Sequence, residues 1–370
     1  MQQYVIKKMR NKYALLIILI LCIVPDFLLA QKDSVKTKRI LIFPVIGKSI
    51  ETGLSFGIAS SATFKLSKSD TTSRTSNLQA IGIYTLKKQM IIALIGTQYF
   101  KKEKFILQEQ IDFSFFPDKF WGLGNNTNDA DVEPYDFKQY YIYLHLLRRL
   151  KNNFFIGSIV EFQHLLEINY EAGGAFDKEN IAGRNRYISS GLGISAIYDN
   201  RNDAFAPNKG GYFLTSFTQY NAVFGSDFNY ANIIIDARKY YRLYKQNVLA
   251  LQAYSLTNVG SEIPIRSIAS LGGANSMRGY YNGRYRDKQL FVLQSEFRFS
   301  LYKRFAAVAF ASLGDVAHSI ADISISNLKY SFGGGLRFAL NKTEKLNLRI
   351  DYGIGKGANS GLYIQLGEAF

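Results

Sequence analysis

The sequence predicts an all-β protein, a transmembrane antiparallel β-barrel of sixteen strands. Three observations predict it: apolar and polar residues alternate in many segments, short and long connections alternate between them, and after residue 30 no apolar run could span a bilayer as a helix. The 370 residues are 47% hydrophobic and carry a formal net charge of +16. Cys22 is the single cysteine, which excludes a disulfide framework or a cysteine-based zinc site.

The first thirty residues are expected to be a signal peptide. Four basic side chains precede an apolar run at 14–24, and Ala30 precedes a plausible cleavage point. The run is shorter than the ~20 residues of a spanning helix, and an uncleaved anchor is the alternative interpretation. The sequence therefore predicts a signal peptide at 1–30, a short segment at 31–38 and an outer-membrane barrel at 39–370, with both mature termini in the periplasm.

Residues 291–302 show the alternation clearly. Leu293 and Phe297 belong to an apolar set of positions, whereas Gln294, Glu296 and Arg298 belong to a polar set. A period of two residues with one apolar face indicates a strand. A soluble sandwich alternates in the same way, so this pattern alone does not place the apolar face against lipid.

The lengths of the connections favour a membrane barrel over a sandwich. Strands are expected near 39–47, 51–66, 76–87, 89–100, 104–115, 135–149, 153–168, 186–199, 211–221, 228–241, 247–259, 288–301, 304–314, 328–340, 345–354 and 361–370. Many connections after even-numbered strands are short and basic, as at 101–104, whereas many after odd-numbered strands are long, as at 260–287. Short periplasmic turns and long outer loops are typical of outer-membrane barrels. Two connections do not fit this rule. The turn that ends at Lys88 follows an odd-numbered strand but is tight, and 199–210 follows an even-numbered strand but is fairly long.

The segment 271–288 is too rich in glycine and too polar for a strand or a helix. Its glycines allow positive φ angles and close backbone approach, and its arginines offer planar donors that suit fixed carboxylates. These residues are Gly272, Gly273, Gly279, Gly283, Arg278, Arg284 and Arg286. We therefore expect a structured loop that has a partner inside the protein.

The stretch 276–287, Ser-Met-Arg-Gly-Tyr-Tyr-Asn-Gly-Arg-Tyr-Arg-Asp, resembles the sixth extracellular loop of the BamA/TamA superfamily of outer-membrane assembly and secretion barrels. The resemblance implies that the tip, Arg278-Gly279-Tyr280, folds into the lumen and that Arg278 pairs with carboxylates on the next two strands. Glu296 matches the first carboxylate. Ser312 stands where the family usually has Asp, so we expect Arg278 to pair with Glu296 alone. This pairing of the loop tip with the barrel wall is here called the lock, and a single lock is expected. An Arg278 that is satisfied by solvent or by a backbone carbonyl is the alternative.

Other segments resemble the same superfamily. Residues 199–210 resemble its long periplasmic turn, and 120–127 resemble a loop common in Bacteroidetes members. The resemblance covers roughly residues 40–370 and implies that four residues support the loop: Gly283, Arg284, Arg286 and Asp287. It also implies a barrel-only member, because residues 31–39 leave no room for a periplasmic polypeptide-transport-associated domain.

The resemblance implies a weak seam between the first and last strands. Pro44 cannot donate a ladder hydrogen bond, and Gly361 loosens the last hairpin. Phe370 ends an alternating segment that resembles the recognition signal of outer-membrane barrels. The candidate seam residues are therefore Pro44, Gly361 and Phe370. Alternatively, Pro44 precedes the first strand and only shapes the path of the chain into the barrel.

The sequence gives little support for an enzyme. Residues 53–57 match the Gly-x-Ser-x-Gly pattern, but Ser55 lies within an alternating strand and not at a strand-turn-helix bend. The three histidines, His145, His164 and His318, have no spacing typical of a metal pair or a triad. We expect no catalytic residue, no metal and no cofactor.

Two functions remain open at this stage. One is a barrel that assists outer-membrane protein insertion or polypeptide translocation, with unfolded outer-membrane proteins as clients and a possible partner chain that carries periplasmic domains. The other is a passive or gated pore, or a structural surface antigen. Outer-membrane lipid, including lipopolysaccharide, is an expected partner and nucleic acid is not, because basic periplasmic turns suit anionic headgroups.

Overall fold

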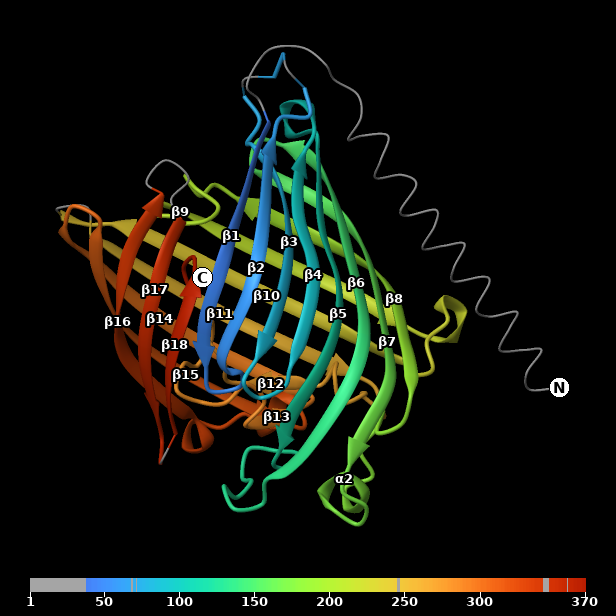
Figure 1. Ribbon diagram of the computed structural model, residues 1–370. Coiled ribbons are helices and arrows are strands. Elements are labelled where there is room, and N and C mark those ends of the chain that lie inside the picture. The colour runs from blue at the N-terminus through green and yellow to red at the C-terminus, as the bar shows by residue number, and fades with distance from the viewer. Residues whose placement is uncertain (1–37, 68, 71, 245–246, 342–345, 358) are drawn as a thin grey trace. The chain divides into compact units, whose positions relative to one another are not determined.

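The structure is a computed structural model that describes residues 38–67, 69–70, 72–244, 247–341, 346–357 and 359–370. The predicted signal peptide and Cys22 lie outside the described residues. Sixteen antiparallel strands close into a barrel, shown in Figure 1, and this confirms the predicted fold class. No helix in the described ranges is long and apolar enough to cross a membrane.

Neighbouring barrel strands follow one another along the chain, apart from the closing pair β1 and β18. The barrel strands are β1 (Lys38–Ser49), β2 (Gly53–Phe64), β3 (Ser76–Thr85), β4 (Met90–Tyr99), β5 (Phe105–Phe120), β6 (Glu133–Lys151), β7 (Phe154–Tyr170), β8 (Tyr187–Asp199), β9 (Gly210–Tyr220), β10 (Tyr230–Arg242), β11 (Val248–Val259), β14 (Gln289–Tyr302), β15 (Phe305–Ala317), β16 (Lys329–Asn341), β17 (Leu346–Gly355) and β18 (Ser360–Leu366). The short strands β12 (Ala269–Leu271) and β13 (Tyr285–Asp287) form a separate hairpin. Short helices occupy three long connections and one turn: η1 (Lys101–Glu103), α2 (Ala175–Lys178), η2 (Ala222–Phe224), η4 (Ile320–Asp322) and η5 (Ile325–Asn327).

The two ends of the barrel carry different connections. One end, here called the loop end, bears the long connections 121–132, 171–186, 221–229, 260–288 and 318–328. The opposite end, called the turn end, bears 65–75, 100–104, 152–153, 200–209 and 303–304. β5 and β6 continue beyond their predicted ends toward the loop end, because residues 116–120 pair with residues 133–137.

Side chains alternate between the two faces of the wall as the sequence predicts. Ile42 and Ile194 point outward and are 73% and 68% exposed, whereas Gln294 and Glu296 point inward and are buried. Phe297, beside Glu296, is again on the outer face. Such an apolar outer surface with a polar interior is typical of a barrel in a lipid bilayer.

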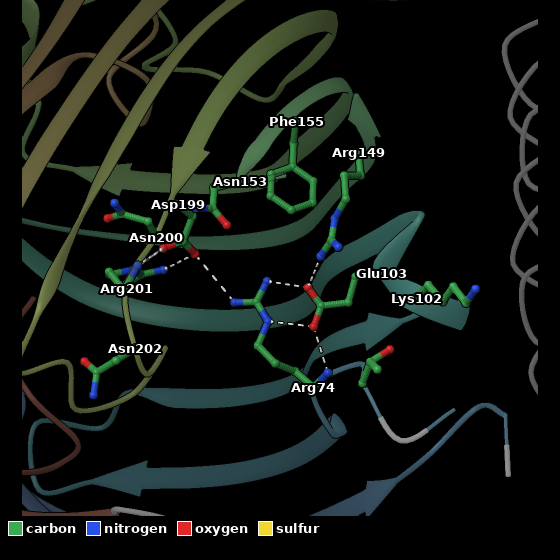
Figure 2. A pocket seen from close by; sticks show the side chains of 11 residues that line it. Arg74, Lys102, Glu103, Arg149, Asn153, Phe155, Asp199, Asn200, Arg201 and Asn202 are labelled. Carbon is green, nitrogen blue, oxygen red and sulfur yellow. Dashed lines mark hydrogen bonds and ion pairs between the residues drawn. The ribbon is translucent and has the colours of Figure 1, made fainter. Parts of the chain in front are cut away.

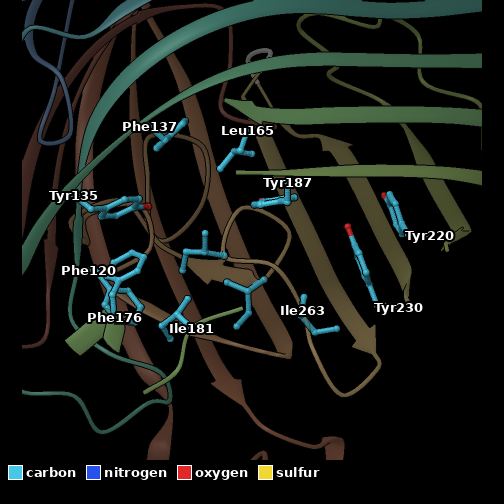
Figure 3. Packing of buried hydrophobic residues seen from close by; sticks show 12 residues of the cluster. Phe120, Tyr135, Phe137, Leu165, Phe176, Ile181, Tyr187, Tyr220, Tyr230 and Ile263 are labelled. Carbon is cyan, nitrogen blue, oxygen red and sulfur yellow. The ribbon is translucent and has the colours of Figure 1, made fainter. Parts of the chain in front are cut away.

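Apolar side chains fill the lumen at the loop end, as Figure 3 shows. Ile263, Ile265 and Ile268, from the start of the connection 260–288, belong to one buried cluster with Phe120 of β5 and Phe176 of α2. Phe120 and Phe176 lie with ring centroids 4.6 Å apart. The connection 260–288 is therefore held by packing before it reaches its tip.

Candidate functional site: the loop lock and the seam

The tip of the connection 260–288 is a compact turn below the β12–β13 hairpin. The Gly273 amide donates to the Tyr280 carbonyl at 3.0 Å, and the Gly283 amide donates to the Leu271 carbonyl at 3.0 Å. The four glycines singled out in the sequence all have positive φ: Gly272, Gly273, Gly279 and Gly283. Glycine adopts this backbone region without the cost that a Cβ would add.

Arg278 is buried between two carboxylates and an aromatic ring. Its Nη2 lies 2.8 Å from Glu296 Oε2 and its Nη1 lies 2.6 Å from Asp351 Oδ2. The guanidinium carbon lies 3.5 Å from the centroid of the Phe310 ring. The pairing with Glu296 expected from the family resemblance is present, and Arg278 is not satisfied by solvent, because its exposed fraction is 0%.

The expectation of a single lock is wrong, because Asp351 of β17 supplies a second carboxylate. Ser312, on β15, is buried, and its hydroxyl has no hydrogen-bond partner among the described residues. Alternation could have found Asp351, since Asn347, Arg349 and Asp351 form the polar set between Leu346 and Tyr352. The second carboxylate thus comes from the hairpin beside the seam, and not from the strand after β14.

Three further arginines surround the same carboxylates. Arg298 Nε lies 2.7 Å from Glu296, and Arg337 contacts Asp351 at 2.5 Å and Glu296 at 3.5 Å. Arg349 lies 3.6 Å from Asp351. Each carboxylate is therefore shared by several guanidiniums, an arrangement that fixes geometry more reliably than it adds stability.

Backbone contacts hold the tip against the β17–β18 hairpin. The Gly279 amide donates to the Tyr363 hydroxyl of β18 at 3.0 Å. The Tyr280 hydroxyl accepts from the Lys356 amide at 2.7 Å and donates to the Tyr330 carbonyl at 3.0 Å. Burial raises the pKa of the Tyr280 phenol to about 12, so this side chain stays a neutral donor.

The predicted support residues lie away from the lock. Arg284 binds the connection 121–132, with its Nη1 2.7 Å from the Thr127 hydroxyl. Arg286 lies 3.2 Å from Asp118, and its carbonyl accepts from the Gly124 amide at 2.7 Å. The Gly283 carbonyl accepts from Arg286 Nε at 3.2 Å, and Asp287 lies 3.6 Å from His318. These residues brace the β12–β13 hairpin, partly on the stretch 120–127.

The seam between β1 and β18 is short. In the described register, Lys48 and Ile364 are the single Cα pair between these strands, whereas all twelve residues of β1 pair with β2. Pro44 lies inside β1 opposite Ile58 of β2, so it does not precede the strand. Gly361 pairs with Gly353 of β17. The connection 260–288 also reaches the β1 side, where the Asn282 amide donates to Glu51 Oε1 at 2.8 Å.

Phe370 does not lie on the seam strand. β18 ends at Leu366, and Gly367 has a φ of +86°. Phe370 is buried in a cluster with Tyr240 and Val248, and its carbonyl accepts from Arg298 at 2.9 Å. The alternating pattern continues past Leu366, but the chain turns away from the strand direction.

Comparison with known proteins identifies the family. The family model described as the Omp85 superfamily domain matches residues 55–370. The solved structure of BamA from Haemophilus ducreyi lacking POTRA domains 1–3 is similar, with 15% identity, a TM-score of 0.61 and coverage of 90% of this chain and 71% of that chain.

Two CdiB structures are also similar. CdiB from Acinetobacter baumannii has 10% identity, a TM-score of 0.58 and coverage of 91% of this chain and 60% of that chain. CdiB from Escherichia coli has 13% identity, a TM-score of 0.58 and coverage of 91% and 63%. The chain thus spans less than two thirds of either CdiB chain, and no curated protein sequence matches it. These likenesses show the fold, and the Bacteroidetes origin stays a prediction. Because the family model matches 55–370, which is most of this chain, the chain belongs to the Omp85 superfamily.

Proposed function

We propose that this Omp85 barrel assists the insertion of outer-membrane proteins or the translocation of polypeptides. In this proposal the barrel spans the outer membrane after export by a signal peptide, with the loop end outside and the turn end, with both mature termini, in the periplasm. The clients are unfolded outer-membrane proteins, and the surrounding lipid includes lipopolysaccharide. The proposed role is not enzymatic; the position of Ser55 in β2 opposite Thr85 supports this part of the proposal, because a nucleophile elbow needs a strand-turn-helix bend.

The short seam is the observation that carries this proposal. Beyond the pair Lys48 and Ile364, β1 has an edge whose backbone groups have no ladder partner from β18 in the described register. Unpaired backbone groups are costly in a bilayer, and a strand edge is a template for another strand. A client segment that adds to β1 would satisfy these groups, which is the physics of strand addition.

The lock connects this edge to the rest of the barrel. Arg278 binds β14 through Glu296 and β17 through Asp351, while Asn282 binds Glu51 between β1 and β2. Because the Gly279 amide also donates to the Tyr363 hydroxyl of β18, the connection 260–288 contacts both sides of the seam. A loop in this position suits a barrel whose closing pair must stay together until a client arrives.

An open passive pore is less well supported. The loop end of the lumen holds the buried cluster that includes Ile265 and Phe176. The tip of the connection 260–288 packs against the inner face of the barrel wall in a second buried cluster beside β12 and β13. A structural surface antigen would keep the same fold without using the seam. The surface-antigen role and the proposed assembly role therefore differ in whether clients contact β1 and β18.

Site-specific crosslinking in native outer membranes tests the proposal. Photoreactive residues would replace Ile46 on β1 and Leu366 on β18, with the outward-facing Ile235 of β10 as the matched control, since all three side chains are exposed. Adducts with nascent barrel proteins at the first two positions, and not at Ile235, are the expected result. Adducts with lipid alone, together with steady ion conductance of the purified protein, would overturn the proposal.

A further inference from the structure

The outer face of the barrel wall carries a groove of about 710 Å³. Five neighbouring strands, β10, β11, β14, β15 and β16, each contribute two outward-facing side chains to its lining. Of these, Leu293 and Phe332 are 42% and 50% exposed. The residue between each pair points to the lumen, as the buried Gln294 and Ser312 do. The groove therefore opens on the surface that meets lipid in the proposed function, away from the lock and the seam.

Small side chains on this face create the groove. Ser295 of β14 and Ala311 of β15 are directly opposed, and Ala253 of β11 lies opposite Leu293. Leu293 and Leu313 are also directly opposed, next to Ser295 and Ala311 on the same face. Because neighbouring strands lie ~4.8 Å apart, a groove across five strands is roughly 19 Å long. A narrow apolar groove of this length accommodates most of a fatty acyl chain.

The groove runs from the turn end into the span of the wall. One row of directly opposed residues follows it: Lys239, Leu251, Ser295, Ala311 and Phe332. Lys239 lies three residues from the turn end of β10, Ser295 seven from that of β14, and Phe332 nine from that of β16. The row leaves the turn end because the strands are tilted, as the oblique course of β10 and β11 in Figure 1 shows.

Lys239 places a positive charge at the turn-end mouth of the groove. Its side chain is exposed, and its Nζ lies 5.8 Å from the ring centroid of Tyr241, two residues closer to the turn end. Asp236, the acidic residue of β10, pairs with Arg238. Among the residues that the structure describes, Lys239 has no ion pair. A lysine on the outer face of a membrane barrel extends its ammonium toward the headgroups, so this charge would meet a headgroup.

The arginines in the polar pocket at the turn end differ from Lys239, because they are already paired. Figure 2 shows Arg74 between Glu103 and Asp199, and Arg149 beside Glu103. Those carboxylates already neutralise the guanidiniums beside them. Lys239 lies instead at the end of an apolar groove, so the ligand that matches both features combines an anion with an apolar chain.

We infer that the outer groove binds an anionic glycerophospholipid, with one acyl chain along Ser295 and Ala311 and the headgroup phosphate at Lys239. The inference rests on the proposed function for the placement of the barrel in a membrane, with the turn end in the periplasmic leaflet. Its own basis is the groove, its direction and the unpaired lysine at its mouth. The acyl chain gains close packing in the groove, and the ammonium forms charge-assisted hydrogen bonds with the phosphate.

Native mass spectrometry of the full-length protein tests the headgroup. The barrel, purified in detergent, would be equilibrated with equal amounts of phosphatidylglycerol and phosphatidylcholine that carry the same acyl chains. The parent should retain one phosphatidylglycerol in about fivefold preference to phosphatidylcholine, and Lys239→Gln should abolish this preference. Arg148→Gln is the matched control, because Arg148 is also exposed and three residues from the turn end, on β6 outside the groove. This variant should keep the preference.

Filling the groove tests the acyl chain. Ala311→Trp should lower the retention of both lipids, because the indole occupies the space of the chain. Ser295→Phe fills the same part of the groove and replaces Ala311→Trp in the test if that variant does not fold. Ala80→Trp is the matched control, since Ala80 is an exposed alanine of β3 that does not line the groove. It should retain both lipids as the parent does.

Five results would overturn the inference. Equal retention of the two lipids by the parent would remove the headgroup site, and equal loss of preference in Arg148→Gln and Lys239→Gln would indicate a diffuse basic rim. Unchanged retention in a folded groove-filling variant would place the lipid elsewhere. Displacement of the lipid by glycerol phosphate as effectively as by phosphatidylglycerol would indicate a small-anion site. A parent dimer that Ala311→Trp dissociates would assign the groove to a second copy. Lipid retention is measured without clients, so its failure is distinguishable from a failure of seam crosslinking.

Discussion

At the scale of residues, the environment of Arg278 determines what its removal would do. Glu296 would still contact Arg298 and Arg337, and Asp351 would still contact Arg337. Neither carboxylate would be left as an isolated buried charge. The cost to the barrel should therefore fall well below the ~3–5 kcal/mol that is typical when a buried partner is left uncompensated.

We predict that Arg278→Ala releases the loop while the barrel stays folded. The loop tip would lose its two ion pairs and its stacking on Phe310, whereas the wall would keep its ladder hydrogen bonds. Limited proteolysis should cut within 272–288 in the variant, and folded mobility on unheated gels should be retained. Arg278→Lys keeps the charge and loses the planar fork, so it should be intermediate. Equal protease resistance of the loop in Arg278→Ala and the parent would contradict the role of the lock.

Asp351→Asn should destabilise the protein more than Arg278→Ala does. The substitution removes a carboxylate from a buried group of arginines that includes Arg278, Arg337 and Arg349, and leaves their charges less compensated. Thermal unfolding followed by circular dichroism should show the larger fall in Tm for Asp351→Asn. Glu167→Gln serves as the control, because the Lys138–Glu167 pair is 41% and 55% exposed and such pairs contribute about 0–1 kcal/mol. A Tm for Asp351→Asn equal to that of Glu167→Gln would show that the second carboxylate is dispensable.

Sequence reasoning reached part of this site. The pairing of Arg278 with Glu296 is implied by the resemblance of the loop to the BamA/TamA superfamily, and alternation independently places Glu296 on the polar face of its strand. Asp351 was missed although it stands on the polar face of its strand, because pairing across the lumen depends on how the barrel closes. Period-two patterning gives the face of a side chain and not its partner on a distant strand.

At the scale of elements, the loop tip and β17 approach each other closely enough to exclude side chains. A Cβ on Gly279 would lie 2.9 Å from the Gly355 nitrogen and 2.9 Å from the Ile354 carbonyl carbon. Gly279 also has a φ of +116°, where other residues are strained. Glycine at this position is therefore required by two independent constraints.

Gly279→Ala should displace the tip from β17 and weaken the lock indirectly. The expected cost is roughly 1–3 kcal/mol, the usual range for a residue forced into a sparsely populated backbone region. Hydrogen exchange should become faster at the amides of 277–283. Gly82→Ala in β3 is the matched control, because a Cβ there meets nothing within 4 Å. Similar exchange in both variants would mean that the tip tolerates the extra methyl group.

The seam is also testable as an element. A disulfide between Lys48→Cys and Ile364→Cys would join the one registered pair, and cysteines at directly opposed positions are within reach of each other. Under oxidation this variant should lose client insertion and regain it on reduction. The pair Thr63→Cys and Asn77→Cys joins β2 to β3, which are already paired along their length, and should have no effect. Unchanged insertion by the oxidised seam variant would rule out opening at β1 and β18.

The end of β18 shows a limit of strand patterns. Leu362, Ile364 and Leu366 continue the expected alternation, yet Phe370 lies inside the barrel, because the chain turns at Gly367. A single glycine with positive φ leaves no trace in a period-two pattern. The same pattern predicts Phe370 among the seam residues.

At the scale of the whole molecule, the barrel and its closure follow from information that the sequence carries in every strand. Alternation and connection length predicted sixteen strands, and the closed order of sixteen confirms it. The contents of the lumen could not be predicted in the same way. Whether a long loop extends outward or packs inward depends on contacts such as Ile265 with the cluster around Phe176, which come from distant parts of the chain.

These contacts predict that the purified protein conducts few ions through its lumen. Ile265 is 1% exposed in the loop-end cluster, so Ile265→Asp would bury an unpaired carboxylate and separate the connection 260–288 from the wall. Planar-bilayer recordings should show rare openings for the parent and sustained conductance for Ile265→Asp. Ile325→Asp adds the same charge at the same end on a side chain that is 89% exposed, and should conduct like the parent. Steady conductance of the parent equal to that of Ile265→Asp would show that the packed loop does not close the lumen, and would return the pore to consideration as the primary function.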